Sequence, residues 1–175
     1  MDLKDYIRSI QDYPKKGILF RDITTLIKDK DAFKNCIDQM SKILTDMDCD
    51  KLAAIESRGF IFASPLSYNL SKPYILLRKK NKLPASRYSV DFKLEYGNAT
   101  LEVHKDSINS KDKVVIIDDL IATGGTAEAA AKLVEKSGGQ VSGFIFVINL
   151  YDLGGKDLLE KKGYKSFSLI DFPGH

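Results

Sequence analysis

The chain has 175 residues, a length that fits one domain in which folding buries roughly two-thirds of the unfolded surface. Hydrophobic residues make up 43% and charged residues 29%, which is ordinary for a globular protein. The 27 basic and 24 acidic residues give a net charge of +3, which does not indicate nucleic-acid binding. No apolar run reaches the roughly 20 residues that cross a bilayer, so we expect no membrane partner.

Two features of the sequence favour a cytoplasmic location. The first residues, MDLKDYIRSI, carry charges throughout and lack the apolar core of an export signal. The two cysteines, Cys36 and Cys49, have no CxxC spacing and are too few for a disulfide framework, which favours reduced thiols. We therefore expect a single cytoplasmic domain spanning residues 1–175.

Strand and helix patterns alternate along the chain. Residues 31–47 place Phe33, Ile37 and Met40 on one face, which is typical of an amphipathic helix. The elements expected after it are strands over 51–55, 74–77, 99–105, 114–117, 143–150 and about 164–170, and helices over about 60–70, 127–136 and 155–162. This order predicts an α/β fold with a mostly parallel central sheet flanked by helices.

A polar stretch between the second and third of these strands, residues 79–94, shows no clear periodicity. Loops of this length are usually functional or disordered, so we expect an irregular lid. A basic cluster surrounds its start, formed by Arg78, Lys79, Lys80, Lys82 and Arg87. Two interpretations stay open from charge alone, a solvated surface loop and a site for a small polyanion.

The strongest chemical signal is VVIIDDLIATGGT, residues 114–126. A buried strand leads into Asp118 and Asp119, and unpaired carboxylates at a strand's carboxyl end can accept hydrogen bonds from a vicinal diol. The following TGGT sequence opens a helix, where glycines allow close approach and free backbone N–H groups suit a phosphate. A diol site beside a phosphate site describes ribose-5-phosphate. The alternative is a simple turn with Thr126 as helix cap.

This motif resembles the site for phosphoribosyl pyrophosphate (PRPP) in type I phosphoribosyltransferases. The resemblance implies the fold of that family, an α/β core with a small hood and a flexible catalytic lid loop. It implies that Asp118 and Asp119 hold the ribose hydroxyls. It also implies a cradle for the 5′-phosphate, made of Ala122, Thr123, Gly124, Gly125 and Thr126.

A second segment is similar to the adenine-specific branch of the family. Residues 13–24, YPKKGILFRDIT, resemble its YPxPGxxFRDIT motif, with Lys16 in place of a common proline. The resemblance implies that about residues 1–30 form a base-binding hood. In it, Phe20 packs against the adenine ring, and the backbone at Leu19 and Arg21 reads the edge of the base.

Two basic segments resemble the family's pyrophosphate site. ESRGF, residues 56–60, is similar to EARGF, and RKKNKLP, residues 78–84, is similar to RKxxKLP. Arginine can grip phosphate oxygens through two parallel hydrogen bonds, so these segments suit pyrophosphate. The residues implied as its ligands are Arg58, Arg78, Lys79 and Lys82. Arg87 is a possible contact of the lid.

The last segment, LEYG at 94–97, resembles the end of the family's lid, which would span about residues 79–97. The resemblance implies that Glu95 exchanges a proton with N7 of adenine, and Tyr96 is a second possible lid contact. A carboxyl group shielded from water can have its pKa raised toward neutrality for such a role.

Taken over nearly the whole chain, the resemblance implies transfer of the phosphoribosyl group from PRPP to adenine, giving AMP and pyrophosphate in purine salvage. It implies a homodimer and Mg²⁺ bound mainly through PRPP, with no metal ligated directly by the protein. Two alternatives stay open: a phosphoribosyltransferase for another base, and a PRPP-sensing regulatory protein.

Overall fold

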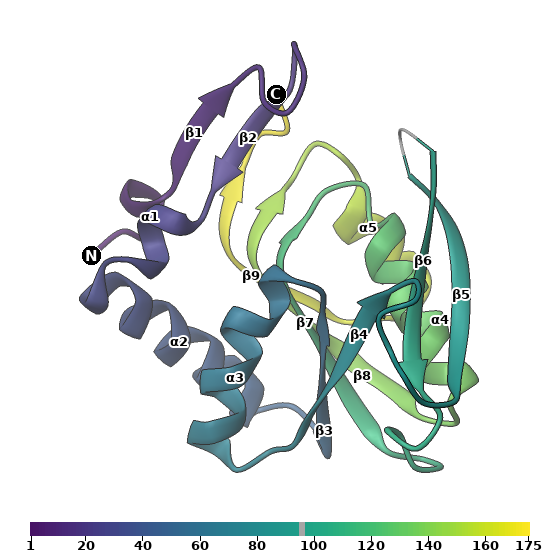
Figure 1. Ribbon diagram of the computed structural model, residues 1–175. Coiled ribbons are helices and arrows are strands. Elements are labelled where there is room, and N and C mark those ends of the chain that lie inside the picture. The colour runs from purple at the N-terminus through teal and green to yellow at the C-terminus, as the bar shows by residue number, and fades with distance from the viewer. Residues whose placement is uncertain (95–96) are drawn as a thin grey trace.

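The computed structural model describes residues 1–94 and 97–175, and a seven-stranded sheet forms its centre (Figure 1). The strand order is β5-β6-β4-β3-β7-β8-β9. The bounds are β3 Lys51–Ile55, β4 Tyr74–Lys79, β5 Arg87–Leu94, β6 Gly97–His104, β7 Lys113–Ile121, β8 Gln140–Leu150 and β9 Ser166–Phe172. Only β6 runs antiparallel to its neighbours β4 and β5, so the predicted mostly parallel sheet is confirmed.

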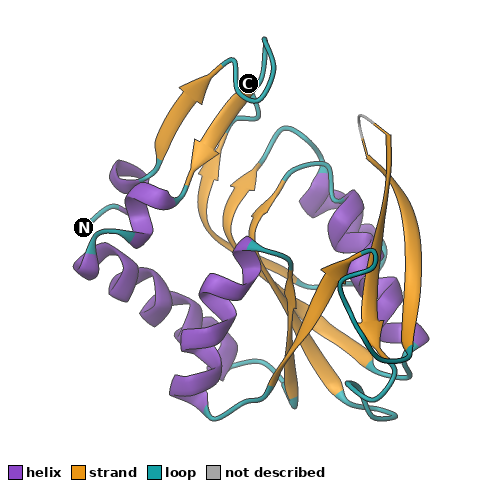
Figure 2. Cartoon of the chain, in the orientation of Figure 1, coloured by secondary structure: helices purple, strands orange, loops and turns teal. Residues whose placement is uncertain are grey.

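Helices cover both faces of this sheet (Figure 2). Helices α2 (Lys30–Thr45) and α3 (Arg58–Leu70) pack on one face, and α4 (Gly125–Lys136) and α5 (Gly155–Lys161) pack on the other. Strand β7 lies between the two layers, with Val115 and Ile117 in one core cluster and Val114 and Ile116 in the other. Its continuous β-branched run therefore reflects burial on both faces, as predicted.

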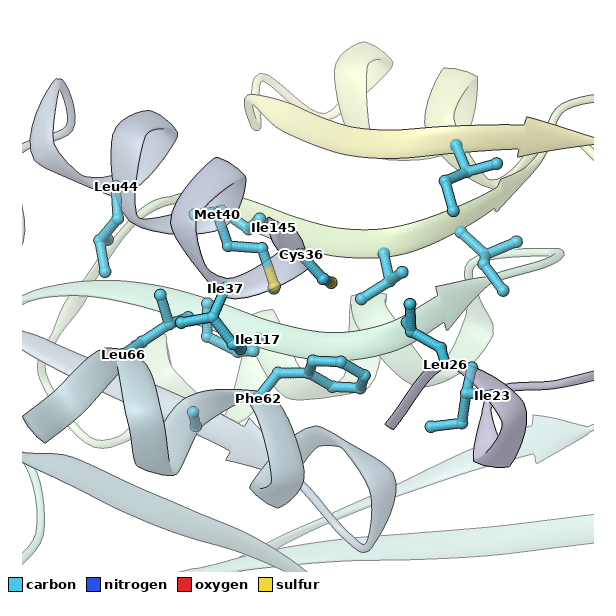
Figure 3. Packing of buried hydrophobic residues seen from close by; sticks show 14 of the residues in the cluster. Ile23, Leu26, Cys36, Ile37, Met40, Leu44, Phe62, Leu66, Ile117 and Ile145 are labelled. Carbon is cyan, nitrogen blue, oxygen red and sulfur yellow. The ribbon is translucent and has the colours of Figure 1, made fainter. Parts of the chain in front are cut away.

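The larger core cluster lies between α2, α3 and the sheet. Figure 3 shows Met40 of α2 and Phe62 of α3 pointing toward Ile117 of β7. Helix α2 begins at Asp29, whose carboxylate accepts hydrogen bonds from the backbone N–H groups of Asp31 and Ala32 at 3.1 and 2.9 Å. This cap fixes the start of the amphipathic helix, so that its apolar stripe faces the sheet.

An N-terminal unit precedes the sheet and contains elements that the sequence patterns did not predict. It comprises the 3₁₀ helix η1 (Leu3–Tyr6), strands β1 (Arg8–Gln11) and β2 (Leu19–Asp22), and the short helix α1 (Thr24–Ile27). The two strands form a separate antiparallel hairpin, which lies beside the carboxyl ends of the sheet strands and the C-terminus (Figure 1).

Two features between β4 and β7 differ from expectation. Residues 87–94 form β5, whereas we expected an irregular loop, because Tyr88, Val90 and Phe92 alternate along the strand and pack against the core cluster beneath α4. On β6, Glu102 alternates with the buried Leu101 and Val103, yet it is itself only 4% exposed. Polar partners explain this burial, since Glu102 accepts hydrogen bonds from Asn81 and Ser89.

Within the described residues, no helix has both the length and the apolar character that a membrane span requires.

Candidate active site

A cavity of about 720 Å³ opens at the carboxyl ends of β3 and β7. Open α/β sheets bind ligands in such crevices. The residues that sequence analysis assigned to a ligand and that line this cavity are Arg58, Lys79, Lys82, Asp118, Asp119, Ala122, Thr123, Gly124, Gly125 and Thr126. The fold therefore brings together the acid pair, the glycine-rich turn and part of the basic cluster.

The acid pair lies inside β7, because this strand continues to Ile121. Asp119 is 4% exposed, and its carboxylate accepts a hydrogen bond from Nε of Arg58 at 2.6 Å. The carboxyl group of Asp118 accepts from the backbone N–H of Asp119 at 2.8 Å. Burial, reinforced by the neighbouring charge of Asp119, raises the pKa of Asp118 well above its usual range. Both residues of the pair line the cavity, where a carboxylate can accept hydrogen bonds from a ligand.

Arg58 reaches Asp119 because α3 begins very close to β7. A Cβ atom on Gly59 would lie 2.7 Å from the carbonyl oxygen of Ile117, so glycine allows this approach. The guanidinium of Arg58 also lies 5.7 Å from the ring centroid of Phe20. Arg58 thus stands between the N-terminal hairpin and the acid pair.

The turn between β7 and α4 has the geometry of an anion cradle. Gly124 adopts φ +91°, and no side chain of the described residues caps the N-terminus of α4. The first backbone N–H groups of this 12-residue helix consequently lack a side-chain acceptor. The start of α5 fixes this turn, because the N–H of Gly155 donates to the carbonyl oxygen of Ala122 at 3.0 Å. A phosphate is the ligand that such a helix start favours.

Three lysines form the basic wall of the cavity. Lys79, Lys80 and Lys82 are exposed, and none forms an ion pair with the described part of the chain. Glu56 fixes the start of this wall by accepting hydrogen bonds from the backbone N–H of Lys79 at 3.2 Å and from Nε of Arg78 at 2.9 Å. Although burial opposes the effect, these contacts hold the pKa of Glu56 below its usual value.

Several residues assigned from sequence lie outside the cavity lining. Arg78 pairs with Glu56, and Arg87 pairs with Glu102. The residues on β2 (Leu19, Phe20 and Arg21) lie on the hairpin, and the side chain of Arg21 turns toward the C-terminal segment. Glu95 and Tyr96 lie outside the described residues. The roles assigned to all of these residues stay predictions.

The cavity also contains residues that sequence analysis did not assign to a site. They include Glu56, Ser57, Lys80, Phe92 and Lys93. The first two stand in the ESRGF segment and Lys80 in the basic cluster, so local patterns already pointed to their neighbourhood. Phe92 and Lys93 reach the cavity only because residues 87–94 form a strand.

Comparisons with known proteins agree with this geometry. The model of the phosphoribosyl transferase domain matches residues 23–174. The adenine phosphoribosyltransferase of Pelagibacter ubique is 70% identical over 100% of both chains, and that of Lachnoclostridium phytofermentans is 51% identical over 98% of each. The crystal structure of adenine phosphoribosyltransferase from Thermoanaerobacter pseudethanolicus is 47% identical, with a TM-score of 0.93 over 97% of this chain and 98% of that one. The chain therefore belongs to the adenine phosphoribosyltransferase family.

Proposed function

We propose that this chain is an enzyme of purine salvage that transfers the 5-phosphoribosyl group from PRPP to adenine, giving AMP and pyrophosphate. The observation that carries the proposal is one cavity that joins an acid pair, a helix start without a side-chain cap among the described residues, and the basic wall of Lys79, Lys80 and Lys82. These features match the diol, the 5′-phosphate and the pyrophosphate of PRPP. The full-length similarity to adenine phosphoribosyltransferases supports the same reaction.

The ribose and its 5′-phosphate would occupy the β7–α4 end of the cavity. Asp118 and Asp119 would each accept a hydrogen bond from a ribose hydroxyl, and the turn from Ala122 to Thr126 would hold the phosphate. Both contacts lie on one continuous stretch of chain, so they fix the direction of the sugar and present its C1 atom to the centre of the cavity. Negative charge on Asp119 would also favour the positive charge that develops at C1 during transfer.

Pyrophosphate would lie against the basic wall. Lys79 and Lys82 line the cavity and form no ion pair with residues 1–94 or 97–175, so their ammonium groups can face the departing anion. Arg58 now donates to Asp119 and would share or exchange this hydrogen bond when pyrophosphate is present. Arg78 would act through its contact with Glu56, which holds the start of the wall.

Mg²⁺ would be held mainly by the oxygens of PRPP, with the carboxylates of Asp118 and Asp119 as the nearby protein oxygens. When bound, it would supply positive charge that stabilises the pyrophosphate leaving group. Mg²⁺ prefers oxygen ligands and keeps several waters, so the oxygens of PRPP and water would supply its ligands, and no direct protein ligand is assigned.

Adenine would bind against β2 of the hairpin. This strand pairs only with β1 in the described structure, so its second edge can offer backbone groups of Leu19 and Arg21 to the base. Phe20 lies within reach of Arg58, which places its ring near the entrance of the cavity. An aromatic face beside backbone donors and acceptors suits a purine. The base-binding hood is accordingly assigned to about residues 1–30.

Proton transfer to and from the base is assigned to Glu95. Its neighbours Lys93 and Leu94, at the end of β5, line the cavity, which supports a role for Glu95 beside the bound base. The lid is assigned to about residues 79–97, within which residues 87–94 form β5 and pack on a core cluster. Tyr96 and Arg87 are assigned as lid contacts. General acid–base groups contribute about 10²–10⁴ in rate, and we expect Glu95→Gln to lower kcat by about 10²–10³. Turnover within threefold of wild type would remove Glu95 from this role.

The decisive test of the proposed function is AMP formation from adenine, PRPP and Mg²⁺. Wild type should form AMP, and the Asp118→Ala, Asp119→Ala double variant should lose nearly all activity because the sugar loses both carboxyl groups. Hypoxanthine, offered in place of adenine, tests the choice of base. A kcat/KM for hypoxanthine comparable to that for adenine would refute adenine specificity.

Two further assignments concern the protein's state in the cell. We place it in the cytoplasm, which agrees with two buried free cysteines.

We assign a homodimer, supported by Tyr68 of α3 at 87% exposure and Leu76 of β4 at 37%. Strand β4 pairs with β6 only at Arg78 and Lys79, which leaves the edge around Leu76 open. Light scattering should show a dimer that Tyr68→Asp weakens, and a monomeric wild type would contradict the assignment.

A further inference from the structure

The hairpin that would read the base has little burial of its own. All four residues of β1 and the first three of β2 are half-buried or exposed, and the pair of strands stands apart from the main sheet. The segment after β2 is anchored differently, because Ile23 and Leu26 join the core cluster. A two-stranded hairpin is marginally stable alone, so something else must set its position.

The side chain of Arg21 ties this hairpin to the C-terminal segment. Its Nη2 donates to the carbonyl oxygen of Pro173 at 2.9 Å, and its guanidinium lies 4.4 Å from the ring centroid of Phe172. Its Nη1 donates to Ser9 on β1 at 2.6 Å, so the same group also joins the two strands. Lys4 adds a second cation, 5.4 Å from the ring of Phe172.

The C-terminal segment is itself fixed to the core, so it can serve as an anchor. The backbone N–H of Tyr151 donates to the carbonyl oxygen of Phe172 at 3.1 Å, and the N–H of Gly174 donates to Asp152 at 2.6 Å. Phe172 ends β9, which pairs with β8 along most of its length. The C-terminal segment that anchors the hairpin and the cavity of the candidate site thus both lie at the carboxyl ends of the sheet strands.

We propose that Arg21, through Phe172 and the backbone of Pro173, is a positioning residue that sets the hairpin at the correct distance from the ribose site. The inference rests on the proposed function, in which the backbone of β2 binds adenine. Reacting atoms must approach to about 3–3.5 Å, and a displacement of about 1 Å can cost about 100-fold in rate. A planar guanidinium that stacks and donates in fixed directions is suited to holding such a position.

Arg21→Met tests the proposal, with Phe172→Ala as a second way of removing the tie. We expect the KM for adenine to rise at least tenfold in both variants, while the KM for PRPP stays within twofold because the β7–α4 cradle is untouched. Arg21→Lys should recover part of the loss, since it keeps a cation over the ring. Phe167→Ala, on the same strand but on a different surface, is the matched control and should behave as wild type.

An adenine KM within twofold of wild type in Arg21→Met would overturn the proposal. Equal increases in both KM values would do the same, because they would indicate a general structural defect. A variant that is only less stable would contain less active enzyme, but neither of its KM values would change. A selective rise in the KM for adenine therefore indicates a loss of positioning.

Hydrogen exchange of residues 19–22 provides a readout that does not depend on catalysis. Exchange should become faster in Arg21→Met and Phe172→Ala and stay unchanged in Phe167→Ala. Unchanged exchange in the first two variants would refute the tie itself. If wild type formed no AMP, the proposed function would fail, yet the exchange data would still decide whether Arg21 holds the hairpin.

Discussion

Two arginine–carboxylate pairs of similar geometry have different surroundings. Nε of Arg58 donates to Asp119 at 2.6 Å, and Nε of Arg87 donates to Glu102 at 3.1 Å. Both carboxylates are 4% exposed. Sequence analysis assigned Arg58 to pyrophosphate and Arg87 to a possible contact of the lid, and of these two only Arg58 lines the cavity.

The partners of the two carboxylates explain the difference. Glu102 also accepts hydrogen bonds from the backbone N–H of Asn81 at 2.8 Å and from Oγ of Ser89 at 2.5 Å, so its acceptors are used within the protein. Among the described residues, Arg58 is the side chain that donates to Asp119, and the second acid, Asp118, stands beside it. A buried ion pair whose carboxylate keeps free acceptor positions beside a cavity can bind a ligand. A pair whose carboxylate has its acceptors used within the protein stabilises the fold instead.

The largest expected effect follows from breaking the pair in the cavity. Arg58→Met should lower kcat/KM for PRPP by about 10²–10³, because removal of one preformed donor to developing charge typically costs that much. Thermal stability should fall as well, because Asp119 is 4% exposed and loses the hydrogen bond from Arg58, so the loss of activity is the readout that distinguishes this pair. Steady-state kinetics and a melting curve on the same sample check both parts. Activity within threefold of wild type would show that Arg58 does not act on PRPP.

The satisfied pair should lose stability with little loss of activity. Arg87→Met leaves the charge of Glu102 buried without its cation, which should cost about 1–3 kcal/mol of the free energy of unfolding. For a chain of this size that corresponds to a Tm lower by roughly 2–12 °C. The kcat/KM should fall less than tenfold. Calorimetry measures the shift.

Lys156→Met is the matched control for this loss of stability. Lys156 forms an exposed pair with Glu160 at 3.8 Å, one turn along α5, and such surface pairs contribute little. Its Tm should stay within about 1 °C of wild type. If Arg87→Met resembled this control in Tm but lost activity as Arg58→Met does, the distinction between the two pairs would be wrong.

The contrast also shows which parts of the molecule local sequence can predict. The β7–α4 turn could be predicted from consecutive residues. The β-branched run indicates a buried strand, the two acids indicate polar groups at its end, and TGGT indicates a turn into a helix. The partners of Arg78 and Arg87 lie 22 and 15 residues away in the sequence. They depend on strand register, which sets Ser89 opposite Glu102 once β5 and β6 pair. That register was not predictable while β5 itself was taken for a loop.

The N-terminal hairpin illustrates a second limit. Strands β1 and β2 have four residues each, too few to establish a periodic pattern, and their position depends on contacts with a segment about 150 residues further along the chain. The motif around Phe20 indicated a base pocket by resemblance alone. The anchor that places it, Arg21 on Phe172, becomes visible only in the fold.

The smallest expected effect concerns a third pair, Arg8 with Asp22, at the base of the hairpin. Burial opposes the shift, but hydrogen bonds from Thr24 and Arg8 lower the pKa of Asp22 from 3.8 to about 2. Because the folded pKa is the lower one, the stabilisation is present above pH 4 and is lost as the pH falls toward 2.

Asp22→Asn measures this contribution against wild type. Arg8 is 57% exposed, so solvent weakens the pair, and we expect the variant to melt about 2–4 °C lower at pH 6. The difference should shrink between pH 4 and pH 2, where wild-type Asp22 also becomes neutral. If the difference in Tm stayed constant down to pH 2, the effect would come from the geometry of the hydrogen bonds with Thr24 and not from the charge of Asp22. This pair would then act as the satisfied Glu102 network does, through hydrogen bonds that hold a strand end in place.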